Sequence, residues 1–435
     1  MQSSLRSLRA SDRCSCLFKP RHFSSSPATC APPFVYTTLP SRALLFIQGT
    51  DAPGFLQGLV SNDVRRLAAR GDEDNPEKQR LVYANILKAD GRYMHDIMLH
   101  RPSSTDSDPA NSFLIDHDAA ATSSLRAYLK RHKLRSKLKI GAGPEQDLVV
   151  AAAWRNPLDT GEGQSSEREV EAAEEWLEER KKAWDPRVNG MGRRWVEERD
   201  GEKPPAELFA PVTPDHFHLH RLVHAVPEGP ADFPALPLEA NIDFMNGVDY
   251  RKGCYVGQEL TARTHHKGIV RKRGMVFRLF REGEDIPMDP LPSQALTPYP
   301  SLFPLPPPGS SLTLLRAGTS RRPRASGKLG SSLALISPSG NLQTLALAYG
   351  SVRTDHLGEG TDEFDGVFTV KADISDEAVV QGSATPGVDG AGGRPVEAGD
   401  GAGESEEEGG RWLAKAFMPA WLEFKLEEEA IAKGL

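Results

Sequence analysis

The residue types best suited to chemistry lie in one short run, residues 251–259, which contains Cys254 between two glycines. Closely spaced glycines predict a tight loop with unusual backbone angles rather than a strand or a helix. Arg251 and Lys252 directly precede the thiol. A positive setting favours the thiolate, which is the form that attacks electrophiles or binds soft metals. We therefore predict a reactive thiolate at Cys254, assisted by Lys252. The other members of this motif loop are Gly253, Tyr255, Gly257, Gln258 and Glu259.

The elements that must position this loop follow from the spacing of apolar and turn residues. Residues 258–263 predict a short helix whose first turn carries an acidic residue, where the helix dipole favours it. Upstream, residues 81–87 and 93–100 predict two strands joined by a hairpin turn. After residue 268, short apolar runs separated by glycine and serine predict a small β-barrel.

Composition limits the possible classes of protein. A chain of 435 residues has room for two or three domains, and its net charge of -7 argues against a nucleic-acid partner. The sequence contains no apolar run near the ~20 residues that a membrane span needs. Three further segments predict insertions: an acidic, solvated helix within 158–183, a Pro-rich segment at 282–308 and a Gly/Glu-rich segment at 384–410.

The N-terminal segment has the composition of a targeting peptide. Residues 1–50 hold six Lys and Arg residues against the single acid Asp12, and they are rich in serine. This composition is typical of a mitochondrial transit peptide, and we expect residues 1–30 to be removed in the mitochondrial matrix. Cys14, Cys16 and Cys30 would leave with it, so that Cys254 remains as the thiol of the mature chain.

The motif loop also carries a family resemblance. Residues 252–259 read K-G-C-Y-V-G-Q-E. They resemble the signature K-G-C-[FY]-x-G-Q-E of the folate-binding YgfZ family, whose relatives include the glycine-cleavage aminomethyltransferase. The resemblance covers roughly residues 40–350. It implies an α+β cloverleaf with a transferase-like fold: two related α/β units within 31–270 and a C-terminal barrel within 271–435, around a channel that holds folate.

The same resemblance implies tetrahydrofolate as a cofactor. A folate channel needs carboxylate or amide partners for the pterin, an aromatic ring for stacking and arginines for the anionic tail. The positions that match the family are Asn62, Tyr83, Arg92, Asp96, Glu239 and Arg263.

The mitochondrial members of this family serve as iron–sulfur cluster assembly factors, and the resemblance implies that role here. One thiol cannot hold a [4Fe–4S] cluster, which usually takes four cysteine ligands. We therefore expect no permanently bound metal. Cys254 would at most be a transient iron ligand, shared with A-type scaffold proteins of the matrix.

Two alternatives remain open, and with them the question of enzymatic turnover. One is a folate-dependent aminomethyltransferase like the glycine-cleavage relative, although that relative's Gly-Gly-x-x-Asp-Asp hairpin is replaced here by residues 91–96 with the single acid Asp96. The other is a passive scaffold in which Cys254 only packs. His265 and His266, expected in a strand, would point to opposite faces and hold no metal.

Overall fold

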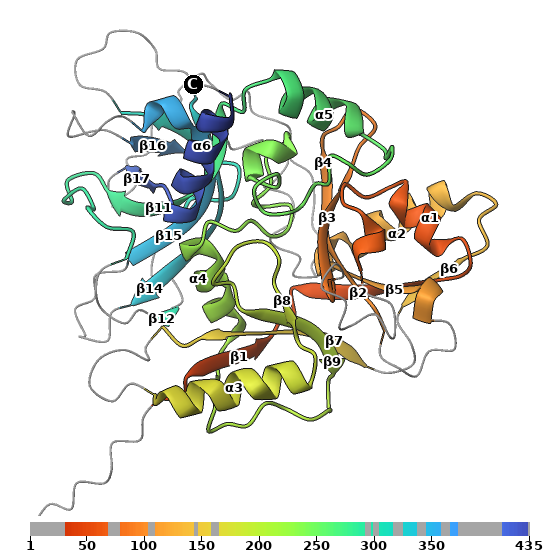
Figure 1. Ribbon diagram of the computed structural model, residues 1–435. Coiled ribbons are helices and arrows are strands. Elements are labelled where there is room, and N and C mark those ends of the chain that lie inside the picture. The colour runs from red at the N-terminus through yellow and green to blue at the C-terminus, as the bar shows by residue number, and fades with distance from the viewer. Residues whose placement is uncertain are drawn as a thin grey trace, which may run out of the picture.

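The computed structural model describes residues 31–67, 79–102, 109–142, 147–157, 165–291, 297–298, 304–315, 325–336, 345–357, 366–372 and 411–433. Three sheets organise these residues. The first and third sheets each have an apolar core of their own, the first and second share another, and the second packs a further core. In Figure 1 the first sheet lies at the right, the second at the bottom and the third at the left.

The first sheet is antiparallel and has the strand order β3-β4-β5-β2-β6. Its strands are β2 (Arg42–Gln48), β3 (Leu81–Leu87), β4 (Tyr93–His100), β5 (Ser112–Asp118) and β6 (Lys139–Ala142). All seven residues of β3 are buried, as in a strand covered on both faces. The helices of this unit are α1 (Ala52–Gln57), α2 (Thr122–Lys133) and the 3-10 helices η1 (Val64–Arg66), η2 (Pro109–Asn111) and η3 (Ala119–Ala121).

The second sheet has the order β10-β1-β7-β9-β8, with β1 and β10 parallel and the other pairs antiparallel. Its strands are β1 (Phe34–Thr38), β7 (Leu148–Arg155), β8 (Ala183–Trp184), β9 (Arg193–Glu198) and β10 (Phe209–Pro211). Two helices pack on it, α3 (Glu167–Glu179) and α4 (Pro214–Val223).

Helix α3 corrects one expectation. The acidic segment was predicted to be a solvated helix, and a helix does form there, with a capping box at Ser166 and Glu169. Ala173, Trp176 and Leu177 are buried against the second sheet, however, so the helix covers a core. Composition alone did not reveal this apolar stripe, because the many glutamates occupy the opposite face of the helix.

The third sheet closes on itself. Its order is β14-β13-β16-β17-β11-β15, and β15 pairs again with β14, which makes a six-stranded barrel. Its strands are β11 (Lys272–Arg281), β13 (Ser311–Leu314), β14 (Gly327–Ile336), β15 (Leu345–Arg353), β16 (Val367–Lys371) and β17 (Trp412–Phe417), with β12 (Thr297–Pro298) on the edge of β14 and the 3-10 helix η5 (Thr354–His356) after β15.

Three elements lie where the barrel meets the other sheets (Figure 1): η4 (Pro237–Ala240), α5 (Gln258–Lys267) and α6 (Ala420–Lys433). Trp421 of α6 donates a hydrogen bond of 2.9 Å to the carbonyl of His224, which follows α4. Arg273 of β11, fully buried, pairs with Asp243 and with Glu429 of α6. The C-terminal helix thus joins the barrel to the segments around η4.

The predicted α+β class with a C-terminal barrel is confirmed. Helix α6 and seven strands were not predicted, and α5 is longer than expected; the strands are β1, β6, β8, β9, β10, β12 and β16. Residues 1–30 and 384–410, and parts of 158–183 and 282–308, lie outside the described residues, so the transit peptide and these insertions stay predictions. Within the described ranges, no helix has both the length and the apolar character needed to cross a bilayer.

Candidate functional site

The motif loop is fixed at its start by Asp249 and Lys252. The side chain of Asp249 accepts hydrogen bonds from the backbone amides of Arg251 and Lys252, at 2.8 and 3.1 Å. The Lys252 ammonium is buried and donates to the carbonyls of Gln57 and Val60, at 2.7 and 2.5 Å. The first carbonyl belongs to the last residue of α1 and the second lies three residues beyond it, so Lys252 ties the loop to the first sheet's helical layer.

This geometry differs from the role predicted for Lys252. We expected its charge beside the thiol, but the two hydrogen bonds of its Nζ go to backbone carbonyls of another segment. Burial lowers the pKa of Lys252 to about 8, although Asp63 and Asp249 act in the opposite direction. Its ring contact is with Tyr255, at 4.6 Å from Nζ to the centroid. Lys252 therefore anchors the loop.

Cys254 itself is a free and exposed cysteine. The three other cysteines belong to residues 1–30, outside the described part of the chain. An exposed thiol is open to a reagent or a partner protein, which a buried one is not. This position does not agree with the alternative in which Cys254 only packs in a core.

The end of the loop packs closely on the hairpin between β3 and β4. Gly257 has φ +82°, and a Cβ built on it would lie 2.4 Å from the carbonyl oxygen of Lys88. Gly91, at the hairpin turn, has φ +80°, and its Cβ would lie 2.5 Å from that of Leu260. Both glycines are therefore required by contact and by backbone angle. Gly253 has no such need, since a Cβ there meets nothing within 4 Å.

The remaining members of the loop lead into α5. Tyr255 is buried and its hydroxyl lies 2.9 Å from that of Thr261, while burial raises the pKa of the phenol. Gln258 is half-buried, and Glu259 is exposed in the first turn of α5, as predicted from the helix dipole. The loop thus presents Cys254 outward between a buried lysine and a buried tyrosine.

Three of the predicted folate residues lie together on the inner side of the first sheet. Asn62 donates to the carbonyls of Tyr83 and Asn246, both at 2.7 Å, so its amide hydrogens hold the backbone. The carboxylate of Asp96 accepts from Arg42, Tyr93 and the amide of Gly229. All of these predicted residues are buried.

Tyr83 differs from its two neighbours because no hydrogen bond of ordinary geometry holds its polar atom. Its hydroxyl is buried, and so are both amide atoms of Asn85, two positions along β3. The Asn85 side chain lies close enough to lower the pKa of the phenol, but neither side chain has another partner among the described residues. Burial raises the pKa of Tyr83, and the negative charge of Asp96 raises it further. Asn85 was not selected from the sequence; its place two residues from Tyr83, on the same face of the strand, was the available signal.

The other three predicted folate residues are not brought together with these. Arg92 is exposed at the hairpin, 3.4 Å from Asp90, and Arg263 is exposed on α5. Glu239 of η4 is half-buried, and no hydrogen bond to its carboxylate is found within the described residues. Burial raises its pKa, and Lys272 opposes that effect. Glu239 is therefore the predicted carboxylate that remains available to a ligand.

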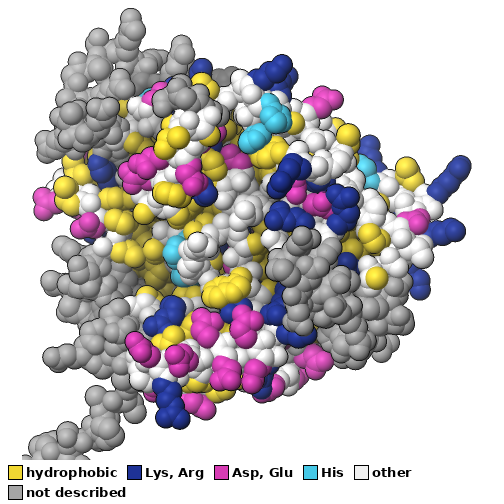
Figure 2. Space-filling view, viewed as in Figure 1, with side chains coloured by type: hydrophobic (Ala, Val, Ile, Leu, Met, Phe, Trp, Pro, Cys, Tyr) yellow, Lys and Arg dark blue, Asp and Glu magenta, His cyan; other side chains and the backbone are white. Residues whose placement is uncertain are grey.

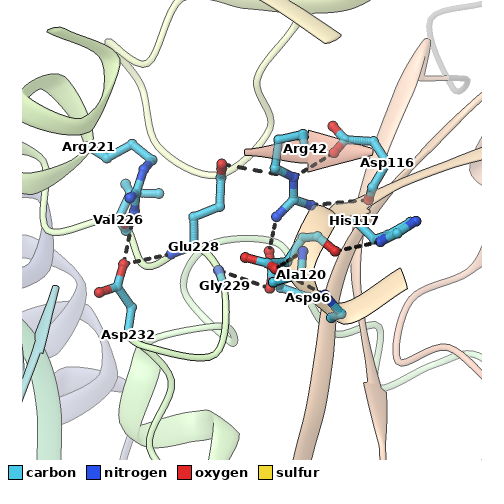
Figure 3. A network of polar contacts seen from close by, with 12 residues as sticks. Arg42, Asp96, Asp116, His117, Ala120, Arg221, Val226, Glu228, Gly229 and Asp232 are labelled. Atoms are coloured by element: carbon cyan, nitrogen blue, oxygen red, sulfur yellow. Dashed lines mark hydrogen bonds and ion pairs between the residues drawn. The ribbon is translucent and has the colours of Figure 1, made fainter. Parts of the chain in front are cut away.

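A buried ion network, which the sequence did not indicate, joins the first two sheets. Figure 3 shows the part in which Arg42 and Asp96 of the first sheet meet Glu228 and Gly229, which follow α4. Asp116 of β5 accepts from Arg42 of β2 at 2.6 Å and from Arg194 of β9 at 2.8 Å. Burial alone would raise the pKa of Asp116, but Arg194 and Arg42 outweigh it and hold that pKa well below its ordinary value. Glu228 pairs with Arg194 and Arg187, both at 2.8 Å, and extends the network toward α4.

The structure also corrects the secondary structure predicted for His265 and His266. His265 and His266 lie in the last turn of α5 and not in a strand, and the His265 ring stacks on Tyr250 at 3.7 Å between centroids. Across the described residues, no group of three or more His, Cys, Asp or Glu side chains is placed to hold a metal ion.

The chain has curated relatives that share its length only in part. No protein-family model matches it. It is 38% identical over 253 residues to the mitochondrial iron–sulfur cluster assembly factor IBA57 homolog of Mycosarcoma maydis, covering 57% of this chain and 58% of that protein. With the human IBA57 protein, also described as mitochondrial, it is 35% identical over 299 residues, covering 67% of this chain and 77% of that protein. The match thus spans little more than half of the fungal relative.

One solved structure also resembles this fold. It is the glycine cleavage system aminomethyltransferase T of Bartonella henselae, with a TM-score of 0.46 and 11% sequence identity over 91% of this chain and 88% of that one. A TM-score below 0.5 carries no conclusion about this chain, whose fold class follows from its own strand pairings.

The fold and the site define an α+β protein with a closed C-terminal barrel and an exposed thiol on an anchored glycine-containing loop. The chain belongs to the iron–sulfur cluster assembly factor IBA57 family, since it is 35% identical to the human member over 77% of that protein's length. This membership confirms the resemblance found in the sequence. It also confirms the mitochondrial location, and we assign the chain to the matrix on that basis.

Proposed function

We propose that this protein assists the maturation of mitochondrial [4Fe–4S] proteins by offering the Cys254 thiolate to a cluster that an A-type scaffold protein carries. The observation that carries this proposal is the exposure of Cys254 on a loop anchored at both ends. Family membership supports the same role, because the relatives are named iron–sulfur cluster assembly factors.

The arrangement suits a shared ligand rather than a resident metal site. A single thiolate completes the coordination of a cluster only if other ligands come from a partner. Exposure lets that partner approach, and the anchored loop holds the sulfur in place without spending binding energy on ordering it. The cluster is cargo in this scheme, and the chain's contribution is one preorganised ligand.

Tetrahydrofolate is part of the proposal as a bound cofactor. The Tyr83 hydroxyl and the Asn85 amide, both buried, fit the amide-like edges of a pterin, whereas the half-buried carboxylate of Glu239 lies on a separate segment, η4, and would have to reach the ring nitrogens from there. Arg92 and Arg263 are exposed cations for the anionic tail. When bound, folate would supply a one-carbon carrier.

No observation favours the aminomethyltransferase alternative. That reaction needs an acid near folate nitrogen to handle a proton. The candidate, Asp96, already accepts from three donors, among them a guanidinium group. We therefore do not propose turnover of that kind.

The central experiment compares Cys254→Ser and Cys254→Ala with Gly253→Ala in mitochondria that lack their own family member. The measured quantity is the activity of a [4Fe–4S] enzyme such as aconitase, corrected for its protein level. We expect both Cys254 variants to lose maturation, while Gly253→Ala keeps it, because a Cβ there meets nothing within 4 Å. Full maturation with both Cys254 variants would overturn the thiol role.

The cofactor is tested separately, by titrating the purified mature protein with tetrahydrofolate and repeating the titration with Glu239→Gln and Tyr83→Phe. Both changes should weaken binding, each by about tenfold, which is the loss expected for one hydrogen bond to a polar group. Glu282→Gln, an exposed carboxylate of the barrel, is the matched control. Equal binding by all four proteins, or no binding at all, would remove these residues or folate from the proposal.

A further inference from the structure

Three separate segments bring basic side chains to the surface around the motif loop. Lys252 ties the loop to the end of α1, which continues to η1 with Arg65 and Arg66. Gly257 lies against the carbonyl of Lys88, on the hairpin that also carries Arg92. The third segment is the loop itself with α5.

The side chains that these segments expose, wholly or partly, carry an excess of positive charge. Segments 63–66, 88–92 and 249–267 hold seven such basic residues and four acidic ones, in a chain whose net charge is -7. The basic residues are Arg65, Arg66, Lys88, Arg92, Arg251, Arg263 and Lys267, and the acidic ones are Asp63, Asp90, Asp249 and Glu259.

The pairing of these charges is uneven. Each acid except Glu259 lies beside one arginine, as Asp63 beside Arg65 at 2.6 Å and Asp90 beside Arg92 at 3.4 Å. No ion pair in the described part of the chain neutralises the remaining basic residues, which are Lys88, Arg251, Arg263 and Lys267. The free charge therefore lies on both sides of Cys254, on the hairpin and on the loop with α5.

Two other regions differ in charge: α3 is acidic, whereas α2 and the segment after it form a second basic region. Its basic residues are Arg126, Lys130, Arg131, Lys133, Arg135, Lys137 and Lys139. Helix α3 carries its glutamates outward, and Figure 2 shows acidic side chains gathered over it at the lower edge, with basic side chains gathered in the upper right part of the view. A uniform acidic protein would repel an anionic partner everywhere. Of the two basic regions, the one formed by segments 63–66, 88–92 and 249–267 contains Cys254, so attraction there would bring an anionic partner to the thiol.

We propose that segments 63–66, 88–92 and 249–267 form a basic docking face for an acidic protein surface that carries a thiolate-bound iron–sulfur cluster. This inference rests on the proposed function and adds how the partner is recognised and oriented. A cluster bound by thiolates is itself anionic, because the sulfides and thiolates outweigh the charge of the irons. Basic residues flanking Cys254 would draw that anion toward the sulfur that must join it.

Electrostatic attraction of this kind acts mainly on the rate of association. Complementary charges steer a partner into the correct orientation, and salt screens the effect. The docking face should therefore govern how fast a cluster-loaded partner binds, while Cys254 governs whether the cluster becomes shared. The two roles are separable by experiment.

The test measures association with a purified A-type scaffold protein loaded with a [2Fe–2S] cluster, at low and at physiological salt. The variant is the full mature chain with Lys88→Glu and Arg251→Glu, both exposed and neither predicted to touch folate. The control is Arg126→Glu with Arg168→Glu, two exposed residues on α2 and α3 that change the net charge equally. We expect the first pair to slow association about tenfold at low salt and the control pair to leave it unchanged.

Each outcome decides one claim. Equal slowing by both pairs, or by neither, would overturn the docking face, and so would a rate that does not depend on salt. Cys254→Ser should associate at the wild-type rate but fail to give the absorbance of a shared cluster. If the wild-type chain associates quickly and salt-dependently yet never shares a cluster, the proposed function fails while the docking face stands. Thermal unfolding of each variant confirms that the fold is intact.

Discussion

The Cys254 loop and the ion network around Asp116 use charged residues in opposite ways. In the network, the side chains of five carboxylates and four guanidinium groups are buried, and each acid pairs with at least one arginine. The acids are Asp96, Asp116, Asp185, Glu228 and Asp232, and the arginines are Arg42, Arg187, Arg194 and Arg221. Around Cys254, the basic residues are exposed and several have no acidic partner in the described structure. Charges that are fully matched hold the sheets together, whereas charges left unmatched remain available to a ligand.

This contrast also sorts the residues selected from the sequence. The side chains of Asn62, Asp96 and Lys252 form hydrogen bonds within the protein. The thiol of Cys254 is exposed, and the carboxylate of Glu239 accepts no hydrogen bond within the described residues. A motif residue can therefore be essential for positioning the loop without contacting a ligand. Substitutions separate residues that hold the fold from residues that remain available to a ligand.

The largest effect on stability is expected from Asp116→Ala in the network. Its removal leaves Arg42 and Arg194 buried without their shared partner, and breaking a buried ion pair costs about 3–5 kcal/mol of the free energy of unfolding. Chemical denaturation at pH 7 measures it. Asp147→Ala, which removes an exposed ion pair with Arg199, is the control and should cause no measurable change. Comparable losses in the two variants would contradict the contrast drawn here.

The next effect concerns pH and the buried histidines of β4. Burial lowers the pKa of His95 from 6.5 to about 4, against the opposing charge of Asp96. Between these values the unfolded chain binds a proton that the folded chain does not, so stability falls as the pH drops from 6.5 to 4. The loss for this one group amounts to at most about 3 kcal/mol.

Denaturation profiles at several pH values test this. His95→Gln should flatten the fall between pH 6.5 and 4 by roughly one bound proton, without removing it, because burial also lowers the pKa values of His100 and His117. If His95→Gln followed the wild-type profile, the buried neutral state of His95 would be wrong.

The sequence predicted local structure far better than it predicted the contacts between segments. Residues 81–87 and 93–100 were identified with the observed bounds, because apolar runs around a turn are a local signal. The network was missed because its partners are far apart, as with Asp116 and Arg194, separated by 78 positions. No local sequence pattern distinguishes an arginine that is buried beside a distant acid from an arginine that stays exposed to solvent.

The difficulty of predicting contacts between distant segments also explains which roles at the candidate site were predicted from the sequence. The signature located Cys254 and the glycines, because their place in the loop is determined by neighbours within a few residues in the sequence. Lys252 was assigned to the thiol because it is two residues away, but its ammonium reaches the end of α1, 192 positions distant at Val60. Sequence proximity alone did not reveal these backbone partners.

A smaller effect is expected within the loop itself, from two glycines four residues apart. Gly257→Ala places a Cβ 2.4 Å from the Lys88 carbonyl at φ +82°, which should cost about 1–3 kcal/mol of stability. Gly253→Ala meets nothing within 4 Å and should be neutral. Thermal unfolding compares them. A destabilised Gly253→Ala beside an unaffected Gly257→Ala would mean that the loop is anchored differently.

The smallest effect on stability is expected at the residue on which function depends most. Cys254 is exposed, so Cys254→Ser should change the free energy of unfolding by less than about 0.5 kcal/mol, as is usual for surface positions. In the mature chain the thiol should react with iodoacetamide under native conditions about as fast as in denaturant, with one group modified per chain, as counted by mass spectrometry. Slow labelling that accelerates on unfolding would show the sulfur to be shielded, and the partner could then reach it only after the loop had moved.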